Sequence, residues 1–259
     1  MDISGFKFIC VDNQKDLLQE TYRLRYKVYC HEAEFLDESE YPDEIERDIY
    51  DDHSVHFAAL DHENNTVGTL RLILHSHLGF PLEKHCPNYD KSQVTAPPSQ
   101  IGEISRLAVS KDWRRRKSDG VYGITSYHQT SSDDKVSQQI IRKRKRPVIV
   151  FGLYKLLYLE SKRRGITHWY AAMEQKLNVA LKRFSFNFKQ IGPVHDYYGP
   201  VIPFLATIEE IEKHIYTEKS EVFHLMLHGL ESHLMPKFGL ALPLRNYIFV
   251  KIAKLMGKI

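Results

Sequence analysis

Cysteine is scarce in this chain of 259 residues, which contains only Cys10, Cys30 and Cys86. The number is odd and no CxxC pair occurs, which argues against a disulfide framework or a zinc ribbon and fits a reducing compartment. No apolar run reaches the roughly 18 residues that a membrane-spanning helix requires, and Lys155 interrupts the nearest one, 148–159. The N-terminus lacks the basic start and apolar stretch of a signal peptide, so we expect a cytoplasmic protein.

Several well-known site motifs are also missing. The chain has no GxGxxG, no GxxxxGK(S/T) and no GxSxG, the motifs of dinucleotide, P-loop and α/β-hydrolase sites. His75, His77, His85 and Cys86 lie close together, but their segment reads as a loop and their spacing matches no zinc site. We therefore expect no metal and no tightly bound cofactor.

The net charge is only +3, but the charges are unevenly distributed. Residues 32–52 hold eleven acidic residues against one basic residue, and residues 111–146 hold eleven basic residues against four acidic ones. Both runs could be solvated loops, although the basic run also suits an acidic macromolecular partner. The clusters 114–117 and 142–146 could attract nucleic acid, but no recognised nucleic-acid module surrounds them, so we expect no nucleic acid partner.

Hydrophobic periodicity predicts an α/β (α+β) fold in which helices flank a mixed, mostly antiparallel sheet. The predicted strands are 6–11, 55–60, 66–74, 101–109, 167–173 and 186–191. The predicted helices are 13–31, 148–164, 174–184, a short helix opened by a capping box at 207–210, 219–233 and 244–258. We predict one domain over 1–206, with a basic flexible insertion at 113–147, and a C-terminal helical extension over 207–259.

The strand predicted at 101–109 carries Glu103, Ser105 and Arg106. Alternation along a strand places Glu103 and Ser105 on one face and Arg106 on the other. Burial raises the pKa of a carboxyl group and can make it a general base. An amine nucleophile needs such a base, because it must lose a proton when it attacks an acyl carbon. The alternative is that Glu103 and Arg106 are buried ion-pair partners that brace the sheet and its loops.

Arg25, Asp48, Asp51 and Arg71 form a second set of charged residues in or beside apolar segments. Two basic and two acidic groups brought together could bind a zwitterionic substrate. They could equally form structural ion pairs that tie the acidic segment to the first helix. The residues alone favour the structural role.

Together these residues resemble the motifs of the acyl-homoserine-lactone (autoinducer) synthases and the related N-acyl amino acid synthases. The resemblance extends over about 6–204, apart from 113–147, and it is nearest to the acyltransferases associated with the PEP-CTERM/exosortase system. All have the GNAT-like acyltransferase fold. The family pattern of substrate-binding residues falls on Arg25, Tyr29, Phe35, Asp48, Asp51 and Arg71, and its E-x-S-R motif falls on Glu103, Ser105 and Arg106. Tyr29 and Phe35 replace the phenylalanine and tryptophan of the autoinducer synthases, whose aromatic patch encloses S-adenosylmethionine.

The resemblance implies an acyl group donated by the phosphopantetheine arm of acyl carrier protein. This arm would lie between the strands 101–109 and 167–173, with Ile104, Leu107 and Phe151 beside the acyl chain or simply in the core. Because acyl carrier protein is acidic, basic residues are expected to dock it. The candidates are Arg142, Lys143, Arg144, Lys162, Arg163 and Arg164.

The leading prediction is an N-acyltransferase that uses the α-amine of a free amino acid as acceptor. One alternative is an S-adenosylmethionine-dependent lactone synthase, and another is a non-catalytic regulator that binds acyl carrier protein. The apolar run 247–256 contains Lys251 and Lys254 and could rest on a membrane surface, although packing against the domain is the more ordinary role.

Overall fold

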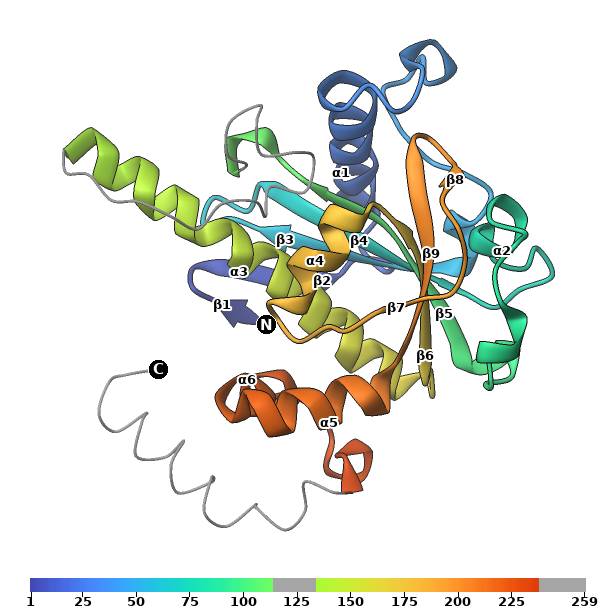
Figure 1. The fold of residues 1–259 in the computed structure, drawn as a ribbon. Coiled ribbons are helices and arrows are strands. Elements are labelled where there is room, and N and C mark those ends of the chain that lie inside the picture. The colour runs from blue at the N-terminus through green and yellow to red at the C-terminus, as the bar shows by residue number, and fades with distance from the viewer. Residues whose placement is uncertain (114–133, 238–259) are drawn as a thin grey trace.

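The computed structural model describes residues 1–113 and 134–237. A single sheet runs through the protein in the strand order β1-β2-β3-β4-β5-β6-β9-β7, and β8 pairs with β9 (Figure 1). Every pairing is antiparallel except that of β5 with β6. This arrangement confirms the predicted fold class.

The strands are β1 Asp2–Ile3, β2 Phe6–Cys10, β3 Ser54–Leu60, β4 Thr66–Leu74, β5 Ile101–Val109, β6 His168–Met173, β7 Lys189–Gln190, β8 His195–Asp196 and β9 Pro200–Thr207. The α-helices are α1 Lys15–Tyr26, α2 Pro81–His85, α3 Asp134–Arg163, α4 Gln175–Lys182, α5 Ile208–Glu218 and α6 Ser220–Leu227. A π-helical turn, Lys27–Glu32, continues α1, and short 3-10 turns occupy several loops.

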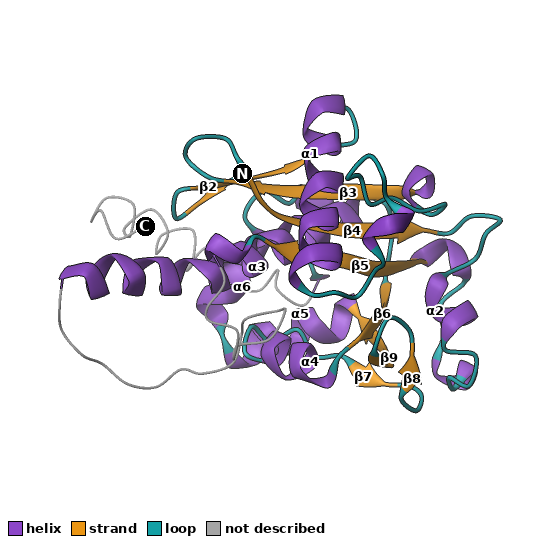
Figure 2. Cartoon of the chain, turned by 90° about the horizontal axis from the view of Figure 1, so that it is seen from above, coloured by secondary structure: helices purple, strands orange, loops and turns teal. Residues whose placement is uncertain are grey.

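Helices cover both faces of the sheet. Helix α1 lies across β3, β4 and β5 on one face (Figure 2), and α2 packs over Ile73, Ile101 and Tyr170 on the same side. Helices α3 to α6 cover the other face (Figure 1), where the main core gathers Leu70, Leu72 and other apolar side chains. Each face therefore has its own core, and the charged residues of interest lie on the α1 face.

Most predicted elements are confirmed, and the differences have physical reasons. Strand β9 was not expected, because Pro200 and Pro203 argue against a central strand, yet it pairs with β6 from Ile202 to Thr207. Only Lys189–Gln190 of the predicted strand 186–191 pairs, because its earlier aromatic side chains turn into the core.

One predicted helix cap and one predicted helix start also differ. Helix α5 begins as expected, but its N-cap Thr207 makes no side-chain cap hydrogen bond, so the predicted capping box does not form. Helix α3 begins at Asp134 rather than at 148, and it contains Pro147. The last part of the predicted insertion 113–147 is therefore helical. The rest of the insertion, 114–133, and the helix predicted at 244–258 lie outside the described residues.

Strands β5 and β6 separate along their length. They pair in parallel only from Ile101 with His168 to Glu103 with Tyr170. Beyond these pairs, a narrow cavity between the two strands is lined by Ile104, Leu107, Tyr154 and Met173, among others. The divergence opens the sheet beside Glu103 and leaves a small cavity whose side chains are mostly apolar.

Lys155 is an unusual member of the core, because its side chain on α3 is only 1% exposed. Within the described part of the chain it has no ion-pair partner, and burial lowers its pKa from 10.5 to about 8. We expect Lys155→Met to raise the free energy of unfolding by roughly 1–3 kcal/mol at neutral pH. The gain should shrink as pH rises from about 8 to 10.5, because the charge that burial penalises is then lost in both states.

Thermal unfolding followed by circular dichroism over this pH range measures the effect. Lys176→Met on α4 is the control, because Lys176 is exposed. Equal melting temperatures of Lys155→Met and wild type would show that the buried ammonium group carries no penalty.

Candidate functional site

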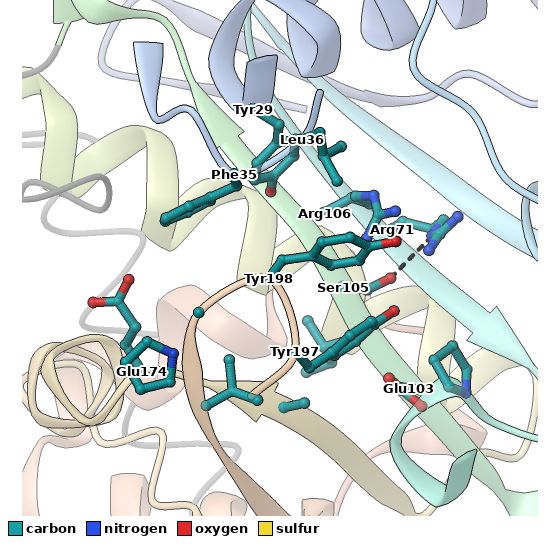
Figure 3. Close-up of a pocket in the computed structure, with 16 residues that line it drawn as sticks. Tyr29, Phe35, Leu36, Arg71, Glu103, Ser105, Arg106, Glu174, Tyr197 and Tyr198 are labelled. Atoms are coloured by element: carbon teal, nitrogen blue, oxygen red, sulfur yellow. Dashed lines mark hydrogen bonds between the residues drawn. The ribbon is translucent and has the colours of Figure 1, made fainter. Parts of the chain in front are cut away.

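A pocket opens where β5 and β6 diverge, between α2, the segment after α1 and the loop that joins β8 to β9 (Figure 3). It borders the narrow cavity between β5 and β6, and the two share Tyr29, Ile104, Ser105, Arg106 and Ala172. Its lining includes Tyr29, Phe35, Leu36, Arg71, Glu103, Ser105, Arg106, Glu174, Tyr197 and Tyr198. The pocket therefore joins a polar wall on β5 to a cleft inside the sheet whose side chains are mostly apolar.

Glu103 is the buried acid of this pocket. Its side chain is 2% exposed, and the backbone N–H of Leu82 at the start of α2 donates to its Oε2 at 2.9 Å. Burial raises the pKa of Glu103 from 4.5 to about 8, although the Leu82 hydrogen bond and the Arg71 charge oppose the shift. Glu103 is therefore held at a pKa near neutral pH, where a carboxyl group can accept a proton from an amine.

Ser105 lies on the same face as Glu103, as alternation along β5 predicts. Its Oγ accepts a hydrogen bond from Nε of Arg71 at 2.9 Å (Figure 3). Arg71 stands opposite Ser105 in the pairing of β4 with β5. The hydroxyl of Ser105 thus joins the pocket wall to a buried arginine.

Arg106 does not follow the predicted alternation. It adopts a left-handed backbone with φ of 53°, and the register of β4 with β5 shifts between Thr69 and Arg71. Such a bulge inserts an extra residue and re-aims a side chain. Arg106 therefore points to the Glu103 face, where its guanidinium donates to Glu46 at 3.1 Å and to Asp48 at 2.9 Å. The prediction that it faces the opposite side is wrong, because the bulge breaks the two-residue period.

The second predicted set closes into a buried ionic network. Arg25 donates to both oxygens of Asp51, at 2.7 and 3.1 Å, and it also binds Glu46. Arg71 donates to Asp48 and Asp51 through Nη1, at 2.7 and 2.8 Å. The side chains of Arg25, Glu46 and Asp51 are at most 1% exposed.

The charges of this network balance. Three arginines, Arg25, Arg71 and Arg106, pair with three carboxylates, Glu46, Asp48 and Asp51, and His56 lies between Asp51 and a fourth carboxylate, Asp12. Burial alone would raise the pKa of Glu46, but the two guanidinium groups beside it lower that pKa to about 2. Burial opposes the shift at Asp51 as well, yet its arginine and histidine partners hold its pKa far below the usual range. Glu46 and Asp51 stay charged because they are paired.

The residues predicted to bind substrate fall into two groups. Tyr29, Phe35 and Arg71 line the pocket, and the rings of Tyr29 and Phe35 stack with centroids 6.4 Å apart. Arg25, Asp48 and Asp51 do not line it and stand behind Arg71 in the network. A role for them in acceptor binding stays a prediction, and any such role is exerted through Arg71 and Arg106.

Sequence reasoning missed the tyrosines of the loop that joins β8 to β9. Tyr197 and Tyr198 extend over the strand that carries Ser105 and Arg106 (Figure 3). Burial raises the pKa of Tyr197 to about 12, and its ring stacks on His85 of α2 with centroids 3.9 Å apart. The turn-rich composition of 192–200 was the only local signal, because the pairing that brings this loop over the pocket is long-range.

The basic residues predicted to dock a carrier protein are placed unevenly. Lys162 pairs with Glu212, and Arg163 binds Glu231 and the carbonyl oxygen of Gly229. Arg164 lies 3.7 Å from Glu160. Lys162 and Arg163 thus hold α5 and the segment after α6 to the end of α3.

These pairs also lie away from the cavity between the strands. Lys162, Arg163 and Arg164 come just before β6 in the chain. The first residues of β6 pair with β5, whereas the last residues of β6 line the cavity. The side chains of Arg142, Lys143 and Arg144 lie outside the described residues. Carrier docking stays a prediction for all six.

The described residues, 1–113 and 134–237, contain no group of three or more histidine, cysteine or acidic side chains that could hold a metal ion. In the same part of the chain no helix is both long and apolar enough to cross a membrane.

Comparison with known families gives a match over a segment that contributes several residues to this pocket. Residues 24–122 match the family described as "Acetyltransferase (GNAT) domain". The match contains Arg25, Arg71 and Glu103, and it covers less than half of the chain. No curated protein matches this chain.

Solved structures with a similar fold include TofI, BjaI and FeeM. The structure of TofI in a ternary complex with an inhibitor and MTA is 15% identical, with a TM-score of 0.58 over 89% of this chain and 100% of that chain. The structure of BjaI, a CoA-dependent acyl-homoserine lactone synthase with SAM and isopentyl-CoA, is 19% identical, with a TM-score of 0.54 over 88% of this chain and 90% of that chain. FeeM, an N-acyl amino acid synthase from uncultured soil microbes, is 13% identical, with a TM-score of 0.50 over 82% of this chain and 95% of that chain.

At these identities the structures establish a shared fold. The chain has the GNAT-like fold, with a mostly antiparallel sheet flanked by helices. The family match and this fold together support an N-acyltransferase.

Proposed function

We propose that this protein transfers a fatty acyl group from the thioester of acyl carrier protein to the α-amine of a free amino acid. The observation that carries the proposal is Glu103, a buried carboxyl group with a pKa near 8 at the point where β5 and β6 diverge. A base of this pKa suits an amine nucleophile. The cleft between the strands suits the thioester arm and its acyl chain.

The reaction needs one bond formed and one broken. The amine nitrogen attacks the thioester carbonyl carbon, Glu103 accepts the proton that the nitrogen loses, and the carbon–sulfur bond then breaks. The released sulfur leaves as a thiol after it receives a proton, and the product is an amide. Glu103 must lie within hydrogen-bond reach of the amine, directly or through a water.

Ser105 and Arg106 have supporting roles on the wall of the pocket. Both line it beside Glu103, and both are held by the ionic network behind them. A hydroxyl or guanidinium group held in a fixed position can stabilise the negative charge that develops on the carbonyl oxygen. The network leaves little freedom for either group to move.

The acyl chain would enter the cavity between β5 and β6, where most of the lining side chains are apolar. Ile104, Leu107, Tyr154 and Met173 line the cavity between β5 and β6. Ile104 and Leu107 both belong to the core on the face away from the ionic network, because the bulge at Arg106 adds a residue between them and breaks the alternation of β5. The related structures support an acyl thioester donor, since BjaI was solved with isopentyl-CoA. A carrier-protein donor is our choice, because the basic run 111–146 complements an acidic partner.

One alternative acceptor is supported by a specific observation. Tyr29 and Phe35 form a stacked aromatic pair at the pocket, and the resemblance relates this patch to the enclosure of S-adenosylmethionine. The structure of BjaI contains SAM. A lactone synthase that consumes S-adenosylmethionine is therefore the second candidate.

The reaction should depend on pH through Glu103, which is a base only as the carboxylate. With a folded-state pKa of about 8, most of the group carries a proton at pH 7, and the active fraction rises as pH increases to about 8. The acceptor amine also titrates, so the informative quantity is the ratio of kcat/KM of wild type to that of Glu103→Gln. We expect this ratio to rise roughly tenfold per pH unit below 8 and to level off above it. A constant ratio would remove Glu103 from the role of base.

The substrate assignment is tested by a matrix of donors and acceptors. Long-chain acyl carrier protein and long-chain acyl-CoA are each supplied with the free amino acids or with S-adenosylmethionine, and products are identified by mass spectrometry. An N-acyl amino acid formed faster from the carrier-protein donor supports the proposal. A lactone with methylthioadenosine supports the second candidate, and preference for acyl-CoA overturns the donor assignment.

Three further predictions accompany the proposal. They are an association with the PEP-CTERM/exosortase system, a cytoplasmic location and contact of 247–256 with a membrane. The last segment lies outside the described residues.

A further inference from the structure

His56 lies behind the pocket and does not line it. It belongs to β3, its side chain is 4% exposed, and it stands opposite Arg71 in the pairing of β3 with β4. Its Nδ1 lies 2.9 Å from Oδ1 of Asp12, and its Nε2 lies 3.0 Å from Oδ1 of Asp51. The imidazole ring thus bridges two carboxylates.

Both ring nitrogens must carry a proton to satisfy these contacts, because a carboxylate oxygen only accepts hydrogen bonds. The ring is therefore an imidazolium. Burial would lower the pKa of His56, but the hydrogen bonds and charges of Asp12 and Asp51 raise it overall. Three other charged or titratable groups face the ring of His56: Arg71 on β4, and Arg25 and Tyr22 on α1. The ring of Tyr22 lies edge-on to that of His56, with centroids 5.6 Å apart.

Asp51 connects His56 to the pocket. Its Oδ1 also accepts from Arg25 at 2.7 Å and from Arg71 at 2.8 Å, so three donors converge on one oxygen. Arg71 in turn donates to Ser105 at the pocket wall. A chain of hydrogen bonds therefore runs from Asp12, which is partly exposed, to a residue that would contact the substrate.

A second branch of this chain reaches the bulge of β5. Arg71 donates to both oxygens of Asp48, at 2.7 and 3.1 Å, and Asp48 accepts from Arg106 at 2.9 Å. The backbone N–H of Asp48 donates to Asp51 at 2.7 Å. The position of Asp51 therefore affects both polar side chains that follow Glu103 on β5.

We propose that His56 is a positioning residue for acyl transfer, which holds Asp51 in place so that Arg71 and Arg106 present a fixed polar wall to the reacting thioester. This inference rests on the proposed function. His56 touches no substrate, and it acts through Asp51 and Arg71. Because a displacement of about 1 Å at a reacting group can cost about 100-fold in rate, the effect belongs in kcat rather than in KM.

Two neutral variants separate the two ends of the ring. The amide nitrogen of His56→Asn takes the place of Nδ1 and keeps the contact with Asp12, whereas that of His56→Gln takes the place of Nε2 and keeps the contact with Asp51. We expect His56→Asn to lower kcat roughly 10- to 100-fold with KM changed less than about threefold. His56→Gln should retain most of the wild-type kcat. A residue that merely filled space would give similar losses in both variants.

An NMR measurement provides a readout that does not need turnover. The Nε–H signal of Arg71, assigned by comparison with Arg71→Lys, should shift in His56→Asn and stay near its wild-type position in His56→Gln. His62→Asn is the control, because His62 is 77% exposed on the turn between β3 and β4. If His56→Asn fails to fold, Asp12→Asn tests the same chain from its outer end. It removes a carboxylate that favours the charged ring, so His56 can lose the proton that binds Asp51, which the amide of His56→Gln cannot. We expect it to shift the Arg71 signal and to lower kcat about threefold or more.

Equal kcat values for His56→Asn and His56→Gln, or an unchanged Arg71 signal in His56→Asn, would overturn the positioning role. Should wild-type protein show no turnover with any amine, the proposed function fails instead, and the Arg71 signal alone decides whether His56 holds the pocket wall.

Discussion

Glu103→Gln should lower kcat/KM for amide formation by roughly 100- to 10,000-fold, the usual contribution of a general base. The glutamine side chain has nearly the same shape, and its carbonyl oxygen can still accept from Leu82 N–H, which now binds Oε2 of Glu103 at 2.9 Å. What it cannot do is take the proton from the amine. The measurement is thiol release under saturating and limiting amine, compared with wild type.

The same variant should be more stable than wild type. A loss of activity in a more stable protein can then be assigned to catalysis and not to unfolding. The pKa of Glu103 is raised from 4.5 to about 8 in the folded state, so between these values the unfolded chain gives up a proton that the folded protein keeps. This difference lowers the stability of wild type progressively from pH 4.5 to 8. Glu103→Gln removes it, and we expect a gain of roughly 1–3 kcal/mol at pH 8 and little gain at pH 4.

Full activity in Glu103→Gln with a native circular dichroism spectrum would disprove the assignment of the base. A loss of activity that came with a lower melting temperature would point to a structural role instead.

Arg25→Met should destabilise the protein by roughly 3–5 kcal/mol at neutral pH, the cost of leaving buried carboxylates without their partner. Arg25 is the only described side chain that binds Glu46 and Asp51 together. In wild type, pairing with Arg25 and Arg106 outweighs burial and lowers the pKa of Glu46 from 4.5 to about 2. Its contribution to stability is therefore present above pH 4.5 and is lost as pH falls towards 2.

In Arg25→Met the pKa values of Glu46 and Asp51 should rise, so the variant should lose stability relative to wild type as pH rises from about 4 to 7. Urea unfolding at several pH values measures this. Arg23→Met is the matched control on the same helix, because the pair of Arg23 with Glu20 is exposed on both sides and such pairs contribute less than about 1 kcal/mol. Similar unfolding midpoints for the two variants would show that the buried network does not stabilise the fold.

Much of the candidate site could be predicted from local patterns in the sequence. Alternation on β5 correctly placed Glu103 and Ser105 on one face, because this part of the strand is regular and pairs with Ile73 and Arg71. The set Arg25, Asp48, Asp51 and Arg71 was expected to gather, and it does so as ion pairs, which the residues alone favoured.

The parts that could not be predicted depend on long-range or irregular structure. The bulge at Arg106 has no sequence signature, since a left-handed backbone usually selects glycine or asparagine. His56 reads as one polar residue inside an apolar strand, and only the fold shows that Asp12 and Asp51 lie on either side of it. Tyr197 reaches the pocket because β9 pairs with β6. Strand β9 was not predicted, because prolines disfavour a strand in the middle of a sheet.

The most direct test of this account is whether amine-dependent thiol release occurs from long-chain acyl carrier protein. Free thiol and amide product would be measured in the same reaction, with and without a mixture of free amino acids. The account predicts that thiol appears only when an amine is present, in equal amount to an N-acyl amino acid. Binding of acyl carrier protein without any amine-dependent release would contradict it and would favour a non-catalytic regulator.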